Sequence, residues 1–256
     1  MPPEPYGPTS PTERSQWNDV PPDQSAQALQ ARITGLLYLV IIVLGLFSEM
    51  YVRGGAVVAG DPAATARNIA GAELLFRVGI VSDIVVFLAD VAVAALLYML
   101  LRPVSRTLSL ATAAFRLTGT AVYSANLLNQ FAALFLATGE GSTGALGRGD
   151  SETLTTFFME LQGHGYDLGL VFFGVHCLGL GVLLVRSDRF PGVLGGLMGL
   201  AGLGYLVGSF TLFLFPGFYD AITPVYVAPL VGEVAFCFWL IVKGVRLTRL
   251  PASSPA

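Results

Sequence analysis

Residues 74–101 read LLFRVGIVSDIVVFLADVAVAALLYMLL, an apolar run with only three charged side chains. At about 1.5 Å of rise per residue, a helix of this length exceeds the roughly 30 Å hydrocarbon core of a bilayer. Comparable apolar runs occupy residues 33–52, 108–137, 154–185, 193–215 and 225–242. The sequence therefore predicts an all-α fold, a bundle of six transmembrane helices surrounded by lipid.

The composition agrees with a membrane protein. Of 256 residues, 54% are hydrophobic and 12% are charged, against about 25% charged in a typical soluble domain. The net charge of −3 gives no indication of nucleic-acid binding. Cys177 and Cys237 both lie in apolar runs, which favours packing over a disulfide framework. The only two histidines are twelve residues apart rather than at metal-binding i, i+4 spacing. We expect no metal site and no cofactor.

The polar segments suggest the domain limits and the orientation. We expect a disordered, proline-rich cytoplasmic tail at residues 1–28, a membrane domain at 29–247 and a short tail at 248–256. Asp61-Pro62 is typical of a helix cap followed by a first-turn proline, and predicts a short surface helix. Six spans place both termini on one side. Basic residues are more numerous there, which predicts cytoplasmic termini: Arg32, Arg102, Arg106, Arg186, Arg189, Lys243, Arg246 and Arg249, against Arg53, Arg67 and Arg148.

Ionisable residues inside the predicted helices form the candidate site. Such groups are unfavourable in hydrocarbon by a few kcal/mol, and persist where they face the protein interior. Four lie about ten residues, or roughly 15 Å, from the cytoplasmic ends of four different helices: Asp90, Arg116, His176 and Glu233. The short turn between the second and third runs makes their helices neighbours, so we expect Asp90 and Arg116 to form an ion pair.

A second polar layer is expected nearer the outer face. Its main members are Arg77, Asp83, Asn126, His164 and Asp167. Arg116, Asn126 and Gln130 follow helical spacing with Gly119 and Tyr123, so the third helix should turn this stripe toward the aspartates of the second.

Each layer has two interpretations. Polar side chains hydrogen-bond across membrane helices and so fix the bundle, and this structural role is favoured for the Asp90–Arg116 pair. They also line proton, ion or substrate paths, and for His176 and Glu233 both readings stay open. Glycines in GxxxG spacing on the fourth and fifth runs indicate close helix packing, with a homo-oligomer contact as the alternative.

Several motifs resemble those of one family. In the first half they are TARNI (65–69), LLFRVGI (74–80), LLRPVSR (100–106) and AFRL (114–117). In the second half they are GLVFFGVHCLGLGVLLVRS (169–187), FPGVLGGLMGLAGLGYL (190–206) and GEVAFCFWLIVKGV (232–245). Together they resemble the bacterial multi-pass membrane family named domain of unknown function 4386. The resemblance implies a bacterial inner-membrane protein and supplies no activity or catalytic residues. It draws attention to Arg77, Arg116, His176 and Glu233, which lie inside the motifs.

We therefore expect an integral membrane protein that handles a small molecule or an ion through its mid-membrane polar layer. An intramembrane enzyme using Glu233 or Asp167 with a histidine is one alternative. A non-catalytic scaffold or sensor is another. A transporter requires a water-accessible route to the layer, an enzyme requires a nucleophile or metal beside an acid or base, and a scaffold requires only that its polar groups be paired.

Overall fold

The computed structural model describes residues 24–244, and all secondary structure in this range is helical. Expectations for residues 1–23 and 245–256, including most of the proline-rich tail, lie outside the described residues. Six long helices form at the predicted places: α2 (Gln24–Leu46), α5 (Glu73–Leu101), α6 (Arg106–Thr138), α7 (Arg148–Val185), α8 (Gly192–Leu214) and α10 (Val227–Val242).

Shorter elements connect the long helices. Two precede α5, namely α3 (Gly54–Ala56) and α4 (Pro62–Gly71), and α9 (Tyr219–Ile222) precedes α10. A π-helical segment, η1 (Phe47–Arg53), extends α2 into α3. The 3-10 helices are η2 (Gly141–Ala145), η3 (Pro216–Phe218) and η4 (Thr223–Tyr226).

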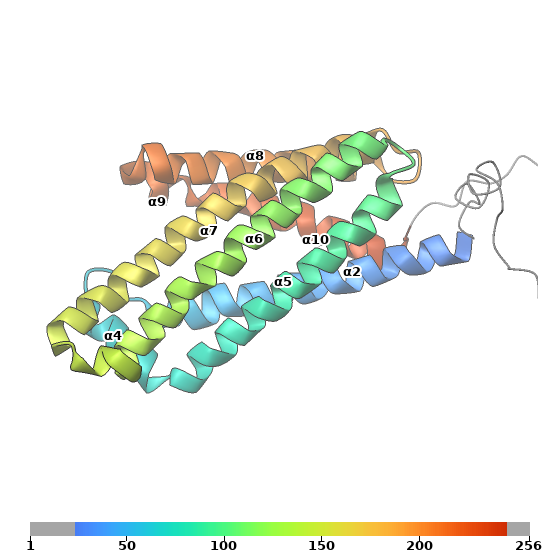
Figure 1. Ribbon diagram of the computed structural model, residues 1–256. Helices are drawn as coiled ribbons and strands as arrows, with labels where there is room; N and C mark the ends of the chain where they lie inside the picture. The colour runs from blue at the N-terminus through green and yellow to red at the C-terminus, as the bar shows by residue number, and fades with distance from the viewer. Residues whose placement is uncertain (1–23, 245–256) are drawn as a thin grey trace, which may run out of the picture.

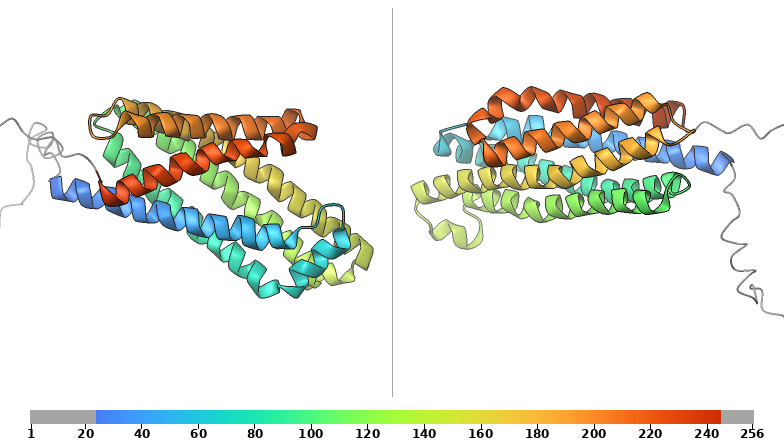
Figure 2. Two further views of the ribbon diagram at one scale, coloured as in Figure 1. Left: turned by 180° about the vertical axis from the view of Figure 1, so that it is seen from behind. Right: turned by 90° about the horizontal axis from the view of Figure 1, so that it is seen from above.

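The six long helices form a closed ring in chain order. Each packs against the next, and α10 returns to pack against α2, as Figures 1 and 2 show. The described chain begins at Gln24 and ends at Gly244 on the same end of the bundle, here called the terminal end. The opposite, distal end carries α4, which lies against α6 and α7. Every long helix thus runs antiparallel to its two neighbours, so residues distant in sequence meet inside the ring.

Five helices are long and apolar enough to cross a membrane, those containing α2, α5, α7, α8 and α10. The sixth predicted span, α6, has 33 residues but is less apolar on average than these five. The reason is that one face of α6 is apolar and the other is polar. Leu110, Leu117 and Leu128 are exposed on the outside of the bundle, whereas Arg116 and Gln130 are buried inside it. A helix with such an inward polar stripe has a lower average hydropathy but still presents an apolar face to its surroundings.

The outer surface of the bundle is apolar, unlike that of a soluble protein. Leu74, Leu88 and Val193 are among the exposed side chains, at 77%, 68% and 74% of their full accessible surface. Contiguous apolar surface of this kind on every long helix requires a non-aqueous surrounding. The protein is a multi-pass helical membrane protein.

Local signals place the helix ends. The Asp61 carboxylate accepts a 2.8 Å hydrogen bond from the Ala64 amide, and Pro62 occupies the first helical turn, so the predicted surface helix and its cap are confirmed. Gly139 ends α6 with φ of +72°, a left-handed conformation that glycine adopts without strain. These caps set where the α6–α7 hairpin turns at the distal end.

Glycines bring α7 and α8 into close contact. A Cβ atom added at Gly181 would lie 2.7 Å from the Gly195 carbonyl oxygen, and one at Gly202 would lie 2.6 Å from the Gly174 carbonyl oxygen. No larger residue fits at such a backbone approach. The predicted close packing of the fourth and fifth helices is confirmed, and both buried cysteines are free thiols in the apolar core.

Candidate functional site

The predicted ion pair between Asp90 on α5 and Arg116 on α6 is present at the centre of the ring. The Arg116 Nε and Nη2 atoms donate to Asp90 Oδ1 at 2.9 and 2.5 Å. Thr120, one turn further along α6, donates from its hydroxyl to the other carboxylate oxygen. The Arg116 side chain is completely inaccessible to solvent. A buried guanidinium with this many donors needs several acceptors, and Asp90 supplies only part of them.

His176 on α7 supplies a further acceptor. Its Nε2 lies 3.0 Å from Arg116 Nη1, and its Nδ1 lies 2.9 Å from the Thr112 carbonyl oxygen. A carbonyl oxygen only accepts, so Nδ1 must carry the hydrogen and Nε2 must accept from Arg116. His176 is therefore the neutral tautomer with both ring nitrogens engaged. A hydrogen-bonded imidazole of this kind is not free to bind a metal.

Glu233 on α10 joins the same group through two tyrosines. Tyr38 on α2 donates to Glu233 Oε2 at 3.2 Å, and Tyr205 on α8 donates to Oε1. Arg116 Nη1 also lies 3.5 Å from the Tyr38 hydroxyl. The guanidinium carbon stands 4.9 Å from the ring centres of both Tyr38 and Phe173, a double cation–π contact. The four predicted mid-membrane residues are thus one connected group, to which all six long helices contribute.

We call this group the central cluster: Tyr38, Asp90, Arg116, Thr120, His176, Tyr205 and Glu233. Its tyrosines and Thr120 were not anticipated from the sequence. Hydroxyl groups in a membrane helix need a partner, but nothing in the spacing of Tyr38 or Tyr205 indicates that the partner is a carboxylate on α10.

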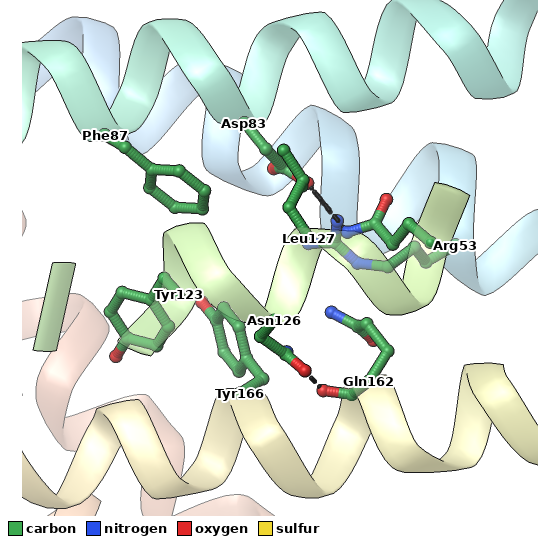
Figure 3. Close-up of a pocket in the computed structure, with 9 residues that line it drawn as sticks. Arg53, Asp83, Phe87, Tyr123, Asn126, Leu127, Gln162 and Tyr166 are labelled. Atoms are coloured by element: carbon green, nitrogen blue, oxygen red, sulfur yellow. Dashed lines mark hydrogen bonds and ion pairs between the residues drawn. The ribbon is translucent and has the colours of Figure 1, made fainter. Parts of the chain in front are cut away.

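The predicted second layer divides into separate groups. On the distal side of the central cluster, Arg53 pairs with Asp83 at 2.6 Å and with Glu49 at 2.7 Å. The same guanidinium donates to the Ser48 hydroxyl, and Gln130 donates to Asp83 at 3.0 Å. We call Ser48, Glu49, Arg53, Asp83 and Gln130 the distal cluster. Figure 3 shows Arg53 and Asp83 meeting between α5 and α6.

The expected position of Arg53 in an outer connecting segment is wrong. Its side chain is buried at 6% exposure, because the π-helical segment Phe47–Arg53 continues α2 and keeps Arg53 on the helix. Glu49 and Arg53 have the i, i+4 spacing of a helical ion pair. That spacing was the one available signal that the helix continues past residue 52.

The other members of the second layer lie apart from Asp83. Arg77 is 37% exposed and pairs with Glu73 and Glu140. His164 is exposed, and its ring bonds to the Glu160 carbonyl of its own helix. Asn126 donates to the Gln162 carbonyl at 2.7 Å, a bond drawn in Figure 3. Asp167 is buried and accepts hydrogen bonds from Ser209 and Tyr226.

Two small cavities adjoin these clusters. One, shown in Figure 3, lies beside Arg53 and Asp83 and is also lined by Phe87, Tyr123 and Tyr166. The other lies toward the terminal end of the central cluster, beside Thr112 and His176. Each has a volume of about 10 Å³, close to what a single water molecule requires. The Thr112 hydroxyl is buried without a hydrogen-bond partner, which is where a water would be expected.

Among the described residues, no group of three or more histidine, cysteine, aspartate or glutamate side chains is placed to hold a metal ion. What the central cluster offers is carboxylates, hydroxyls and one imidazole in contact with each other. These groups can hold and exchange protons.

The fold and this buried polar group define the class as a multi-pass helical membrane protein with an ionisable centre. Residues 33–244 match the family described as Domain of unknown function (DUF4386), and the chain belongs to this family. The resemblance inferred from the motifs is thereby confirmed.

One relative is a protein of Archaeoglobus fulgidus named "Uncharacterized protein". It is 32% identical over 171 residues, which span 67% of this chain and 86% of the relative. No solved structure matches the chain. A similar protein thus occurs in an archaeon, and the expected bacterial inner membrane stays a prediction.

Proposed function

We propose that this membrane protein handles protons, and that the central cluster is the group that holds the transferred proton. The observation that carries the proposal is an imbalance of charge. The cluster contains two carboxylates, Asp90 and Glu233, but only one guanidinium, Arg116, because His176 is neutral. With both carboxylates ionised the cluster carries one net negative charge.

That net charge is unfavourable at this depth. Asp90, Arg116 and Glu233 are 6%, 0% and 8% exposed, and an uncompensated charge in hydrocarbon is unfavourable by several kcal/mol. Within the described part of the chain, no second lysine or arginine pairs with the cluster. Binding one proton neutralises it. Glu233 is the expected carrier, because Arg116 forms an ion pair with Asp90 whereas the hydrogen bonds to Glu233 come from the tyrosine hydroxyls.

The size of the adjoining cavities favours a proton over a larger ligand. A volume of about 10 Å³ accommodates a water molecule but not an organic solute. Of the two expected functions, handling of an ion is therefore supported better than handling of a small molecule.

A scaffold is the second candidate. The observation that favours it is that Arg116, Asp90, His176 and Glu233 all have hydrogen-bond partners, and that these partners tie all six long helices together. Interhelical polar contacts of this kind stabilise membrane bundles. An intramembrane enzyme has no comparable support, since the partners of Glu233 are phenol groups rather than a nucleophile activated by a base.

A flux measurement separates these candidates. The purified protein is reconstituted in vesicles with an internal pH-sensitive dye, a pH gradient is imposed, and a potassium-valinomycin system holds the membrane potential. We expect wild-type vesicles to equilibrate faster than empty ones, and Glu233→Gln to remove the difference. The matched control is Glu160→Gln, which changes an exposed carboxylate on α7. Equal rates in wild-type, Glu233→Gln and empty vesicles would contradict proton handling and favour the scaffold.

The remaining expectations about location and assembly are also proposals. Because Arg53 is buried in the bundle, only Arg67 and Arg148 remain of the three basic residues assigned to the outer connections. The excess of basic residues on the side of the termini is therefore larger, which supports cytoplasmic termini in an inner membrane. Gly192, Gly196 and Gly199 face open space, so this side of α8 is where a homo-oligomer contact is proposed.

A further inference from the structure

We propose that Asp167 is a second proton-binding residue, and that Tyr226 and Tyr205 pass the proton between Asp167 and Glu233 along one face of α8. This proposal rests on the proposed proton handling by the central cluster. It adds the route by which a proton reaches that cluster from the distal end.

Asp167 has the surroundings of such a residue. It lies on α7 with 5% exposure. Its Oδ1 accepts from the Ser209 hydroxyl at 3.0 Å and from the Tyr226 hydroxyl at 2.9 Å. Within the described residues it forms no ion pair with arginine or lysine. Asp167 is therefore a second buried carboxylate that contacts hydroxyls and lacks a compensating cation.

The carboxylate connects to the exterior of the bundle. Tyr219 on α9 lies beside Asp167 and Tyr226 and is partly exposed. Burial raises the pKa of Tyr219 from its ordinary value, with a further contribution from the Asp167 charge, so its hydroxyl keeps its proton at neutral pH. His164, one turn before Asp167, is exposed on the same helix. The proposed entry for a proton from the distal end therefore passes Tyr219, beside Asp167, and His164, on the same helix.

One face of α8 carries hydroxyl groups that bond to both Glu233 and Asp167. Tyr205 donates to Glu233, and Ser209, four residues later, donates to Asp167. Four residues correspond to about 6 Å along a helix. The rings of Tyr205 and Tyr226 adjoin, with centres 6.2 Å apart. Gly208 makes room for this arrangement, because a Cβ atom there would collide with the Tyr226 hydroxyl.

The transfer balances as a hydroxyl relay. The proton of protonated Asp167 passes to the Tyr226 oxygen, Tyr226 releases its own proton to the Tyr205 oxygen, and Tyr205 releases its proton to Glu233. The relay requires the two hydroxyls, on rings whose centres lie 6.2 Å apart, to be joined by hydroxyl rotation or by one bridging water. Both tyrosines end neutral, Asp167 becomes a carboxylate and Glu233 becomes a carboxylic acid. No electron, metal or co-reactant takes part.

The other route from the distal end is less suited to protons. Between Asp83 of the distal cluster and Asp90 of the central cluster, the rings of Phe87 and Tyr123 stack with centres 6.0 Å apart. A phenylalanine ring neither donates nor accepts a proton. The α8 face, by contrast, has a hydrogen bond between a tyrosine hydroxyl and a carboxylate at each end.

The test uses the full-length protein in the vesicle assay described above. Tyr226→Phe and Tyr205→Phe each remove one hydroxyl with little change of shape, and Asp167→Asn removes the carboxylate. We expect each to slow the proton flux by at least about tenfold. The matched controls are Tyr51→Phe, which changes an exposed tyrosine, and Asp150→Asn, which changes an exposed aspartate. Both controls should keep the wild-type rate.

Other outcomes separate the relay from the function on which it rests. If Glu233→Gln stops the flux while Tyr226→Phe and Asp167→Asn keep the wild-type rate, the relay is wrong and proton handling stands. If wild-type vesicles show no flux above empty ones, both are wrong. Size-exclusion profiles identify any variant that fails to fold, and the two Tyr→Phe changes then decide the outcome.

Discussion

The central and distal clusters have the same ionic composition in different surroundings. Each holds one arginine and two carboxylates, with Arg116 in the first and Arg53 in the second. In the distal cluster the Glu49 side chain is 50% exposed, so the extra carboxylate lies at the bundle surface. In the central cluster Glu233 is 8% exposed and enclosed by tyrosines. On the proposed function, burial rather than the set of residues makes the extra carboxylate of the central cluster a proton-binding site.

The largest expected effect follows from removing the central arginine. Arg116→Gln leaves Asp90 and Glu233 buried without a cation, and we expect a loss of folding free energy of about 3–5 kcal/mol. Arg116→Lys should recover little of this, because an ammonium cannot reproduce the two bonds to Asp90 and the ring contacts. Unfolding in mixed micelles titrated with denaturing detergent measures both. A variant as stable as the wild type would show that the cluster contributes nothing to folding.

A double-mutant cycle measures the interaction energy of the Asp90–Arg116 pair in the central cluster. Asp90→Asn alone leaves Arg116 without its ion-pair partner, whereas Asp90→Asn with Arg116→Gln removes both members of the pair. We expect the single change to destabilise the bundle more than the double change, with a coupling of about 1–3 kcal/mol. The same micelle titration gives the coupling. Additive effects of the two changes would count against the pair.

The matched change in the distal cluster should be milder. Arg53→Gln leaves Asp83 with its bond from Gln130 and leaves Glu49 half-exposed at the bundle surface. One buried carboxylate, Asp83, loses its cation, against two in Arg116→Gln, so we expect a loss of about 2–3 kcal/mol. A loss equal to that of Arg116→Gln would remove the proposed distinction between the clusters.

The smallest effects are expected from the extra carboxylates. Glu49→Gln changes a half-exposed pair, for which about 0.5 kcal/mol or less is expected. Glu233→Gln replaces the proposed proton carrier with a neutral side chain of nearly the same shape, so stability should change by less than about 1 kcal/mol although flux is lost. A large loss of stability in Glu233→Gln would indicate that the ionised carboxylate is a structural element.

The periodicity and composition of the sequence predict the helices well, and the matched positions of Asp90, Arg116, His176 and Glu233 along them predict that these residues lie at one level of the bundle. Asp90 and Arg116 could be paired in advance, because a short turn joins their helices and their depths match. Arg53 could not be placed, since a charged residue at the end of an apolar run resembles a loop residue, and the π-helical extension of α2 depends on tertiary packing. Tyr38 and Tyr205 contact Glu233 only because the ring closes between α2 and α10, a long-range feature that local spacing does not encode.

The most direct test of the account is an infrared measurement of carboxyl protonation in reconstituted membranes at neutral pH. The account predicts a C=O stretching band from protonated Glu233, which disappears in Glu233→Gln and persists in Glu49→Gln and in Asp167→Asn, the change that removes any band from the second buried carboxyl group. Absence of that band in the wild-type protein, or its persistence in Glu233→Gln, would contradict the claim that the charge imbalance of the central cluster is met by a proton on Glu233.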